Sequence, residues 1–256
     1  MGGVVHILIT CLDGVFNPAS LLVLRTIRKG FPTAQVHVHG NNLRQSLPPT
    51  VKYYADACGV VGNYHYYNET ITHGEWIERL LALENEPFWI CDADVIFYDK
   101  IEDWSFTGPM FAGRYEPEYV DPWSQVVHVA RLHPSLMWFD PAALRIAMRN
   151  WPANFPEFLN TTELSLVKWH IIPRHRDRPL FYDTCAGLHQ AFGGFRFTED
   201  MNQACAHLFA GSYSHLMAPA VDLREVHSAV IQQPELGRKL WDGQQKWYAE
   251  HAVQPK

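Results

Sequence analysis

Two aspartates, Asp92 and Asp94, interrupt a nearly continuous apolar run between Phe88 and Tyr98. A short apolar run that follows a proline is typical of a buried strand. If the strand ends at Cys91, the turn after it presents both carboxylates at the carboxyl end of the strand, where open α/β sheets bind their ligands. Carboxylates are costly to bury unpaired, and a hard divalent cation is their natural partner. An Asp-x-Asp triplet can also be a solvated turn or a helix cap, but the apolar flanks on both sides favour a metal site.

The length and composition predict a globular chain that folds as one large domain or two small ones. The chain has 256 residues, and 47% of them are hydrophobic, which is ample for a core. The formal net charge of −6 offers no basic field for a nucleic-acid backbone, so we expect no nucleic-acid partner. We expect no signal peptide, because the N-terminus has no cationic segment followed by a long apolar core. We expect no transmembrane segment, because no apolar run approaches the ~20 residues that span a bilayer.

The cysteines are scattered, odd in number and lack Cys-x-x-Cys spacing. This pattern predicts reduced thiols in a cytoplasmic protein. The five positions are Cys11, Cys58, Cys91, Cys185 and Cys205.

The N-terminal part of the chain has the order strand, helix, strand. Val4 to Leu12 predicts the first strand, and Gln35 to His39 predicts the second. Asn17 as N-cap and Pro18 at the first helical position predict a helix that stops at Gly30. A βαβ unit of this kind implies a parallel sheet flanked by helices.

A second helix is expected directly before the strand that carries the aspartates. Thr72 and Glu75 have the spacing of a capping box, which predicts a helix from Glu75 to Leu83. On the Gln35 to His39 strand, His37 and His39 share one face, so metal binding is possible there, but we favour solvated or hydrogen-bonded histidines.

The rest of the chain alternates between further strands, helices and loops. We expect strands at 111–114, 132–140 and 195–197, helices from Ala142 to Met148 and from Asp183 to about Ala191, and a terminal helical segment at 219–251. Residues 115–130 are expected to form a loop or an inserted ribbon, and residues 150–180 an irregular connection. Leu47-Pro48-Pro49 is expected to be a loop.

The order of these parts resembles the GT-A class of nucleotide-sugar glycosyltransferases. The resemblance is carried by Asp92-Ala93-Asp94 after an apolar strand, by the later strand Pro134 to Asp140, and by the pair His73-Gly74. Asp183 at a helix start and His207 with Gly211 follow in the same order. The resemblance implies one GT-A-like, Rossmann-related domain. Its nucleotide-sugar half covers about 1–100, its acceptor half about 101–218, and a C-terminal helical segment 219–256.

One motif departs from the pattern of the retaining branch. That branch carries His-x-x-Gly-x-x-Lys, whereas here His207 and Gly211 are one residue further apart and Ser214 follows in place of the lysine. The subfamily and the stereochemistry of transfer therefore stay open.

The resemblance also implies a donor site. Asp94 would ligate the metal, Asp92 would contact metal, water or ribose, and His207 would add a ligand from the far side. A nitrogen ligand beside carboxylates suits Mn²⁺, with Mg²⁺ as the alternative. His207 as a structural histidine is an equal reading. The residues assigned to the nucleotide-sugar are Thr10, Asp13, His73, Arg79, Asp92 and Ala93.

Several other side chains have two readings each. Asp183 is assigned as the catalytic base of an inverting enzyme, and a plain N-cap is the alternative. Arg79 could reach a phosphate or be a solvated helical arginine. The basic cluster Arg174, His175, Arg176 and Arg178 could clamp a phosphate or be surface. Three tryptophans could stack on sugars or belong to the core; they are Trp123, Trp138 and Trp169.

These features predict a metal-dependent glycosyltransferase that moves a sugar from a nucleotide-sugar, with UDP favoured, to an acceptor hydroxyl of unknown identity. A divalent cation that bridges the diphosphate would stabilise the charge of the leaving group. The first alternative is a metal-dependent phosphohydrolase or nucleotidyltransferase. The second is a non-catalytic nucleotide-sugar-binding protein, since fold does not fix function.

Overall fold

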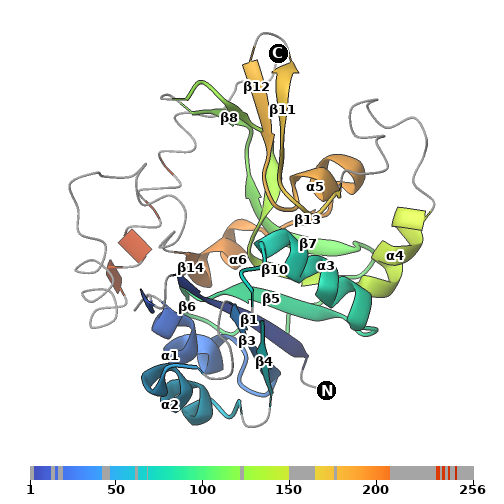
Figure 1. Cartoon of the computed structure of the whole chain (residues 1–256). Coiled ribbons are helices and arrows are strands. Elements are labelled where there is room, and N and C mark those ends of the chain that lie inside the picture. The colour runs from blue at the N-terminus through green and yellow to red at the C-terminus, as the bar shows by residue number, and fades with distance from the viewer. Residues whose placement is uncertain are drawn as a thin grey trace. The chain divides into compact units, whose positions relative to one another are not determined.

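Strand β1 and helix α1 begin the structure as the sequence predicts (Figure 1). β1 spans Val4–Leu12 and pairs in parallel with β3, Gln35–Asn41, and the connecting helix α1 spans Ser20–Gly30. The predicted cap at Asn17 and Pro18 lies outside the described residues. The computed structural model describes residues 3–12, 15–16, 20–41, 47–60, 63–67, 69–121, 124–149, 165–175, 178–207, 235–236, 238–239, 242 and 246.

The described residues group into two compact units. The first unit comprises Met1–Ile71, Trp89–Ser105 and Thr198–Gln244, and the second comprises Thr72–Phe88, Phe106–Phe197 and Gln245–Lys256. Each unit is assembled from separate stretches of chain. The predicted single domain and its halves stay a prediction, and most of the segment 219–256 lies outside the described residues.

In the first unit, strands lie in the order β5, β1, β3, β4. Both β1 with β3 and β3 with β4 are parallel. One face of these strands is fully buried apolar surface, including Ile7 and Val36, and helices α1 and α2 pack against each other in the same unit (Figure 1). The other elements of this unit are β2 (Val15–Phe16), α2 (Pro49–Ala57), β4 (Tyr64–Tyr66), β5 (Phe88–Asp92), β6 (Val95–Phe97), α6 (Glu199–Gln203) and β14 (Cys205–His207).

The loop predicted at Leu47-Pro48-Pro49 ends one residue early, because helix α2 begins at Pro49. The helix begins at Pro49, with Pro48 in the N-cap position. Proline lacks the backbone N–H that the first turn of a helix leaves unbonded anyway, so two prolines here start a helix instead of preventing one.

In the second unit, helix α3 confirms the predicted capping box. α3 spans His73–Leu83, and the Thr72 hydroxyl accepts a hydrogen bond from the backbone N–H of Glu75 at 3.2 Å. The Glu75 carboxylate accepts one from the backbone N–H of Thr72 at 2.8 Å. Two N–H groups that the helix leaves unbonded are thereby satisfied.

The strands of the second unit match the prediction in the middle of the chain and differ from it later. The expected strands at 111–114, 132–140 and 195–197 and the ribbon in 115–130 are confirmed, but 150–180 is not irregular throughout, because β11 and β12 form an antiparallel pair there. The elements are β7 (Phe111–Glu116), β8 (Tyr119–Val120), β9 (Val127–His128), β10 (Arg131–Phe139), α4 (Pro141–Arg149), β11 (His170–His175), β12 (Arg178–Tyr182), α5 (Ala186–Phe192) and β13 (Phe195–Arg196).

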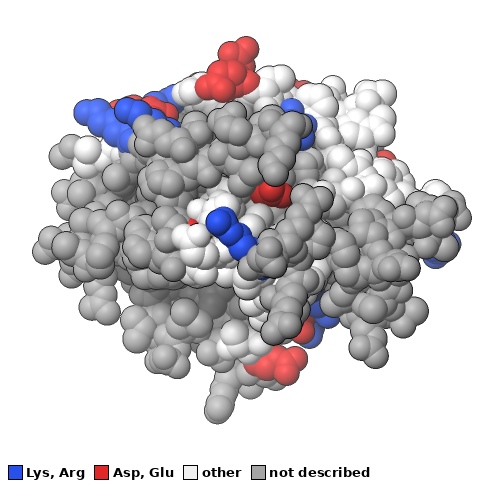
Figure 2. Space-filling view, turned by 90° about the horizontal axis from the view of Figure 1, so that it is seen from above, with Lys and Arg blue, Asp and Glu red and all other residues white. Residues whose placement is uncertain are grey.

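The predicted α/β class with a mostly parallel sheet flanked by helices is confirmed. The pairs β1–β3, β3–β4 and β13–β7 are parallel, and β10–β7 is antiparallel. Within the described ranges, every helix is too short or too polar to span a bilayer. Figure 2 shows the described basic and acidic side chains of one face in small separate groups. The expected lack of a nucleic-acid partner stays a prediction.

Histidines line the second face of the first unit's parallel strands. His37 Nδ1 lies 3.0 Å from His65 Nε2, and His39 Nδ1 lies 3.1 Å from the Tyr67 hydroxyl oxygen. His6 Nδ1 lies 3.0 Å from His39 Nε2. The preferred reading of His37 and His39 as hydrogen-bonded side chains is confirmed.

The burial of His6 predicts a loss of stability in acid. Burial, followed by the nearby His37 and His65, lowers the pKa of His6 from 6.5 to about 3. As the pH falls, His6 is protonated in the unfolded chain before it is protonated in the folded protein. The stability of the folded protein that depends on neutral His6 is therefore fully present above pH 6.5 and is lost as the pH falls towards 3. We expect the wild-type free energy of unfolding to fall more steeply between pH 6.5 and 4 than that of His6→Gln, by up to about 1.4 kcal/mol per pH unit. Urea unfolding at several pH values measures this difference, and equal slopes would contradict it.

Candidate metal centre

The two aspartates flank the turn between β5 and β6. Asp92 is the last residue of β5, one position beyond the predicted end, and Asp94 directly precedes β6. The predicted presentation of both carboxylates by a turn after a buried strand is therefore observed. The strand itself is buried from Phe88 to Cys91, which fixes the position of the turn.

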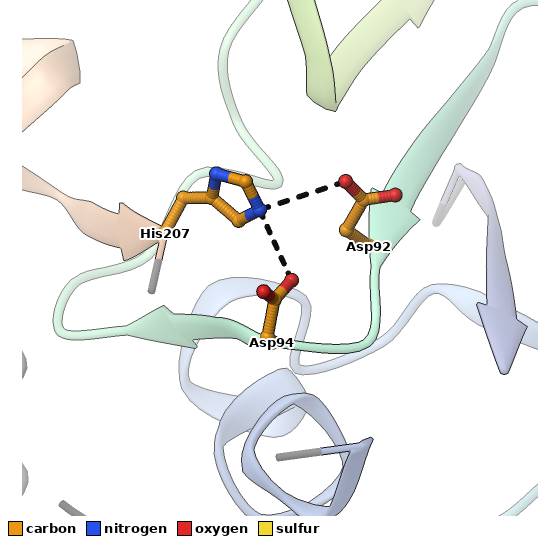
Figure 3. A group of neighbouring side chains, drawn as sticks. All are labelled: Asp92, Asp94 and His207. Carbon is orange, nitrogen blue, oxygen red and sulfur yellow. Dashed lines mark ion pairs between the residues drawn. The ribbon is translucent and has the colours of Figure 1, made fainter. Parts of the chain in front are cut away.

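His207 reaches this turn through a strand from the far end of the described chain. β14 pairs antiparallel with β6, and His207 lies opposite Val95. His207 Nε2 is 3.1 Å from Asp94 Oδ1 and 3.6 Å from Asp92 Oδ2 (Figure 3). One ligand atom from each of the three residues lies within 4.8 Å of the others. Figure 3 shows the three side chains pointing towards a common point.

The cluster is largely shielded from water. The side chains of His207, Asp94 and Asp92 are 6%, 12% and 22% exposed. The neighbouring Cys91 thiol is fully buried, and burial together with the nearby Asp92 carboxylate raises its pKa well above the ordinary value. The carboxylates therefore lie in partly desolvated surroundings, where an unpaired charge is costly.

Helix α1 holds the turn and β6 in place. The backbone N–H of Val23 donates to the Ala93 carbonyl at 3.3 Å, and the N–H of Phe97 donates to the Thr26 hydroxyl at 3.1 Å. Gly30 packs so closely on the Phe97 ring that an added Cβ would lie 2.5 Å from it. These contacts hold β6, and with it the pairing that positions His207.

The donor set fits a divalent cation. Two carboxylate oxygens and one imidazole nitrogen suit Mn²⁺, and carboxylates also suit Mg²⁺. Three protein ligands leave other coordination positions for water or for phosphate oxygens. Within the described residues, this is the one group of three or more acidic, histidine or cysteine side chains with such spacing.

The other residues assigned to the donor lie on separate elements or outside the described residues and side chains. His73 and Arg79 lie on α3 of the second unit, where the His73 ring stacks on Trp76 at 5.5 Å and Arg79 is exposed. Thr10 belongs to β1, but its side chain and the whole of Asp13 lie outside the described residues. Ala93 takes part through its carbonyl alone. Their roles stay predictions.

Asp183 belongs to a buried ion-pair network of the second unit. Arg131 Nη1 lies 2.7 Å from Asp183 Oδ2, and Arg131 Nε lies 2.5 Å from Glu116 Oε2. Asp183 Oδ1 accepts a hydrogen bond from the backbone N–H of Thr184 at 2.7 Å. The N-cap reading is wrong, because α5 starts after Cys185, whose φ of 65° places it in the left-handed region. Asp183 thus holds a turn before the helix, and its carboxylate is tied to Arg131.

Glu116 and Arg131 were not identified by sequence reasoning. They face each other across the β10–β7 pair, and both are buried, at 7% and 4% exposure. Glu116 ends one apolar strand and Arg131 begins another. In a sequence, a charged residue at the end of a strand is equally consistent with a side chain exposed to solvent. Their pairing becomes visible only with the register of the two strands.

The structure describes only some of the tryptophans and basic residues that were assigned possible sugar or phosphate contacts. Trp138 packs on Phe106, with ring centroids 5.1 Å apart, whereas Trp169 is 51% exposed. Arg178 begins β12 and is exposed. The predicted features outside the described residues or side chains are Trp123, Arg174, His175, Arg176, Gly211 and Ser214.

Comparison of the sequence with family models and with curated proteins finds no match. Solved structures do match the fold. The structure is similar to glycosyltransferases. An active-site mutant of LgtC matches 90% of this chain and 95% of its own, with a TM-score of 0.47 and 10% sequence identity. The galactosyltransferase LgtC in complex with donor and acceptor sugar analogues matches 99% and 98%, with a TM-score of 0.44 and 11% identity.

The mannosyltransferase PcManGT from Pyrobaculum calidifontis, in complex with GDP-Man and Mn²⁺, matches 60% of this chain with a TM-score of 0.41 and 14% identity. The chain spans 48% of the length of PcManGT, and 39% and 45% of two further glycosyltransferases that it matches. These relatives belong to the class that the sequence resembles. A likeness of this strength does not transfer an activity from one protein to another.

Removal of one metal ligand tests the centre. We expect Asp94→Ala and His207→Gln each to weaken Mn²⁺ binding at least tenfold, because each removes a direct ligand and even outer-shell changes often cost 10–100-fold. Asp99→Ala, which removes an exposed carboxylate beyond β6, is the matched control and should bind as the wild type does. Calorimetric titration with Mn²⁺ measures the affinities. Equal affinity in all four proteins would exclude this site.

Proposed function

We propose that the protein is a metal-dependent glycosyltransferase that uses a nucleotide-sugar donor, with UDP the favoured nucleotide, and an acceptor hydroxyl. The observation that carries the proposal is the convergence of Asp92, Asp94 and His207 at the carboxyl end of a buried strand. Ligands of open α/β folds bind at this end of the strands. Mn²⁺ is the favoured metal and Mg²⁺ the alternative.

A cation held by this set of ligands would assist sugar transfer. The diphosphate leaving group gains negative charge as the bond to the sugar breaks, and a bound divalent cation supplies Lewis-acid stabilisation of that charge. Asp94 and His207, whose ligand atoms are 3.1 Å apart, would hold the cation. Asp92, the most exposed of the three at 22%, would bind the cation or a water or ribose hydroxyl beside it.

The number of carboxylates favours sugar transfer over phosphate hydrolysis. Two-metal phosphohydrolases bridge a pair of cations about 3.5–4 Å apart and need more carboxylates than two. The described cluster supplies Asp92 and Asp94 with a single histidine, which is a set for one cation.

The assignment of Asp183 as catalytic base comes from the family resemblance, and a partly exposed side chain is compatible with it. Its side chain is 18% exposed, and Arg131 and the Thr184 N–H hold one carboxylate oxygen each.

The nucleotide is identified by thermal melting with a panel of UDP- and GDP-sugars, with and without Mn²⁺. We expect a shift of several degrees that needs both the metal and one nucleotide, since a ligand at a hundred times its Kd adds about 2.7 kcal/mol of stability. The shift should vanish in Asp94→Ala and persist in Asp99→Ala. No shift with any nucleotide, whatever the metal, would count against a glycosyltransferase and move the proposal to the phosphohydrolase.

Turnover separates an enzyme from a nucleotide-sugar-binding protein and tests Asp183. With the nucleotide-sugar that melting identifies, we expect release of the nucleoside diphosphate on addition of an acceptor, and a loss of 10²-fold or more in Asp183→Asn. Donor-dependent stabilisation should be unchanged in that variant. Full turnover by Asp183→Asn would leave the residue a purely structural part of the network with Arg131 and Glu116.

A further inference from the structure

A row of side chains crosses the four-stranded sheet of the second unit. The strands lie in the order β11, β12, β9, β8, and their register places Ile171 opposite Phe181 and Phe181 opposite His128. His128 in turn lies opposite Tyr119. Partners in register on neighbouring strands share one face of a sheet, so these side chains form a single row. The Trp169 ring, 6.3 Å from that of Phe181, completes this cross-strand row.

The rings of the cross-strand row pack against one another. The Tyr119 and His128 rings are stacked, with centroids 4.4 Å apart and planes 14° apart. The Phe181 ring meets His128 edge to face, at 5.0 Å and 80°. Both arrangements are ones that aromatic pairs prefer. The row is therefore a fixed surface whose rings hold one another in place.

The two faces of this sheet differ in their surroundings. Ile172 and Leu180, which alternate with members of the row along β11 and β12, pack against a buried core cluster. On the face of the row, Trp169 is 51% exposed and Ile171 is 53% exposed. Exposure falls to 3% at Tyr119, the opposite end. The row thus runs from the protein surface into the interior of the second unit.

The buried end of the row lies beside the carboxylate assigned as catalytic base. Burial, followed by the nearby Glu116 carboxylate, raises the pKa of Tyr119, and Asp183 adds to this effect. Burial lowers the pKa of His128, and the nearby Glu116 and Asp183 oppose that shift. Both rings are therefore within electrostatic reach of the network that holds Asp183. A ligand lying along the row has one end at this network.

The chemistry of the row matches a carbohydrate. A sugar ring has an apolar C–H face and a rim of hydroxyl groups, so it needs flat apolar surface together with a few polar groups. Trp169 and Phe181 offer the flat apolar surface. His128, kept neutral by burial, carries one N–H donor and one acceptor nitrogen, and a hydroxyl can pair with either.

The length of the row favours an oligosaccharide over a single sugar. Neighbouring strands lie about 4.7–4.9 Å apart, so the three steps from β11 to β8 span about 14 Å. One sugar ring is shorter than this distance. A chain of several sugars can follow the row from Trp169 to His128.

A protein partner fits this face less well. β11 is the edge strand, but Pro173 lacks a backbone N–H and the β11–β12 register shifts between Ile172 and His175. An irregular edge with a proline is a poor template for a further strand. The two half-exposed side chains of the row also offer far less than the ~800 Å² per partner that a stable protein interface buries.

We propose that the cross-strand row from Trp169 to Tyr119 binds an oligosaccharide, and that this oligosaccharide is the acceptor, with a hydroxyl at its inner end directed to Asp183. The acceptor role rests on the proposed sugar transfer. Binding of the oligosaccharide does not, because every residue of the row lies outside the metal centre.

The first test measures binding by the full chain without nucleotide or metal. The probes are cellotetraose, chitotetraose, mannotetraose and lacto-N-neotetraose, titrated by calorimetry. We expect at least one to bind, with the affinity lowered about tenfold or more in Trp169→Ala and largely retained in Trp169→Phe. Tyr53→Ala removes a 69% exposed aromatic ring from α2 of the first unit and is the matched control, with unchanged binding. No binding of any probe, or equal binding by Trp169→Ala, would overturn the proposal.

Turnover separates failure of this inference from failure of the proposed function. With the nucleotide-sugar that melting identifies and the bound oligosaccharide as acceptor, we expect Trp169→Ala to raise the acceptor KM about tenfold. The kcat and the donor-dependent melting shift should be unchanged. An unchanged KM would overturn the acceptor role and leave sugar transfer standing. Oligosaccharide binding with neither turnover nor a melting shift would overturn sugar transfer and the acceptor role, and would confirm the row as a carbohydrate-binding surface.

Discussion

The repulsion between Asp92 and Asp94 is the constraint that the first unit is built around. Their ligand atoms lie within 4.8 Å of each other, where two unit charges repel by about 3.5 kcal/mol or more at an effective dielectric of about 20. Burial of the strand before them prevents water from screening this repulsion fully. A cation bound between them turns the same geometry from a cost into a binding site, and His207 adds a ligand that a solvated turn would not need.

Packing around the turn holds this arrangement in place. Thr26 and Gly30 of α1 hold β6, which in turn pairs with the strand that ends at His207. These contacts therefore keep the two carboxylates close together. Preorganised charge of this kind is how proteins stabilise a leaving group without spending energy on rearrangement.

The parts of the fold that sequence could predict are those with local signals. The capping box at Thr72 and Glu75 needs only residues three apart, and the apolar run that ends at Asp92 identifies its own strand. The β11–β12 pair and helix α2 were missed because prolines in both segments indicated irregular chain, while backbone pairing and an N-terminal helix position accommodate them.

In the candidate site, too, local spacing predicts some residues, whereas strand pairing places the others. The Asp92 and Asp94 carboxylates follow from sequence spacing, but the place of His207 depends on the pairing of β14 with β6, and only the family resemblance indicated it. Asp183 was placed near a helix start correctly, yet its partners Arg131 and Glu116 come from two strands whose register no local pattern reveals.

The most direct test of the account is a crystal of the protein soaked with Mn²⁺ and a uridine diphosphate, measured with X-rays near the manganese absorption edge. The account predicts an anomalous peak within bonding distance of Asp94 and His207, with diphosphate oxygens on its open side. A map with no peak at these residues, or with the nucleotide bound elsewhere, would contradict it.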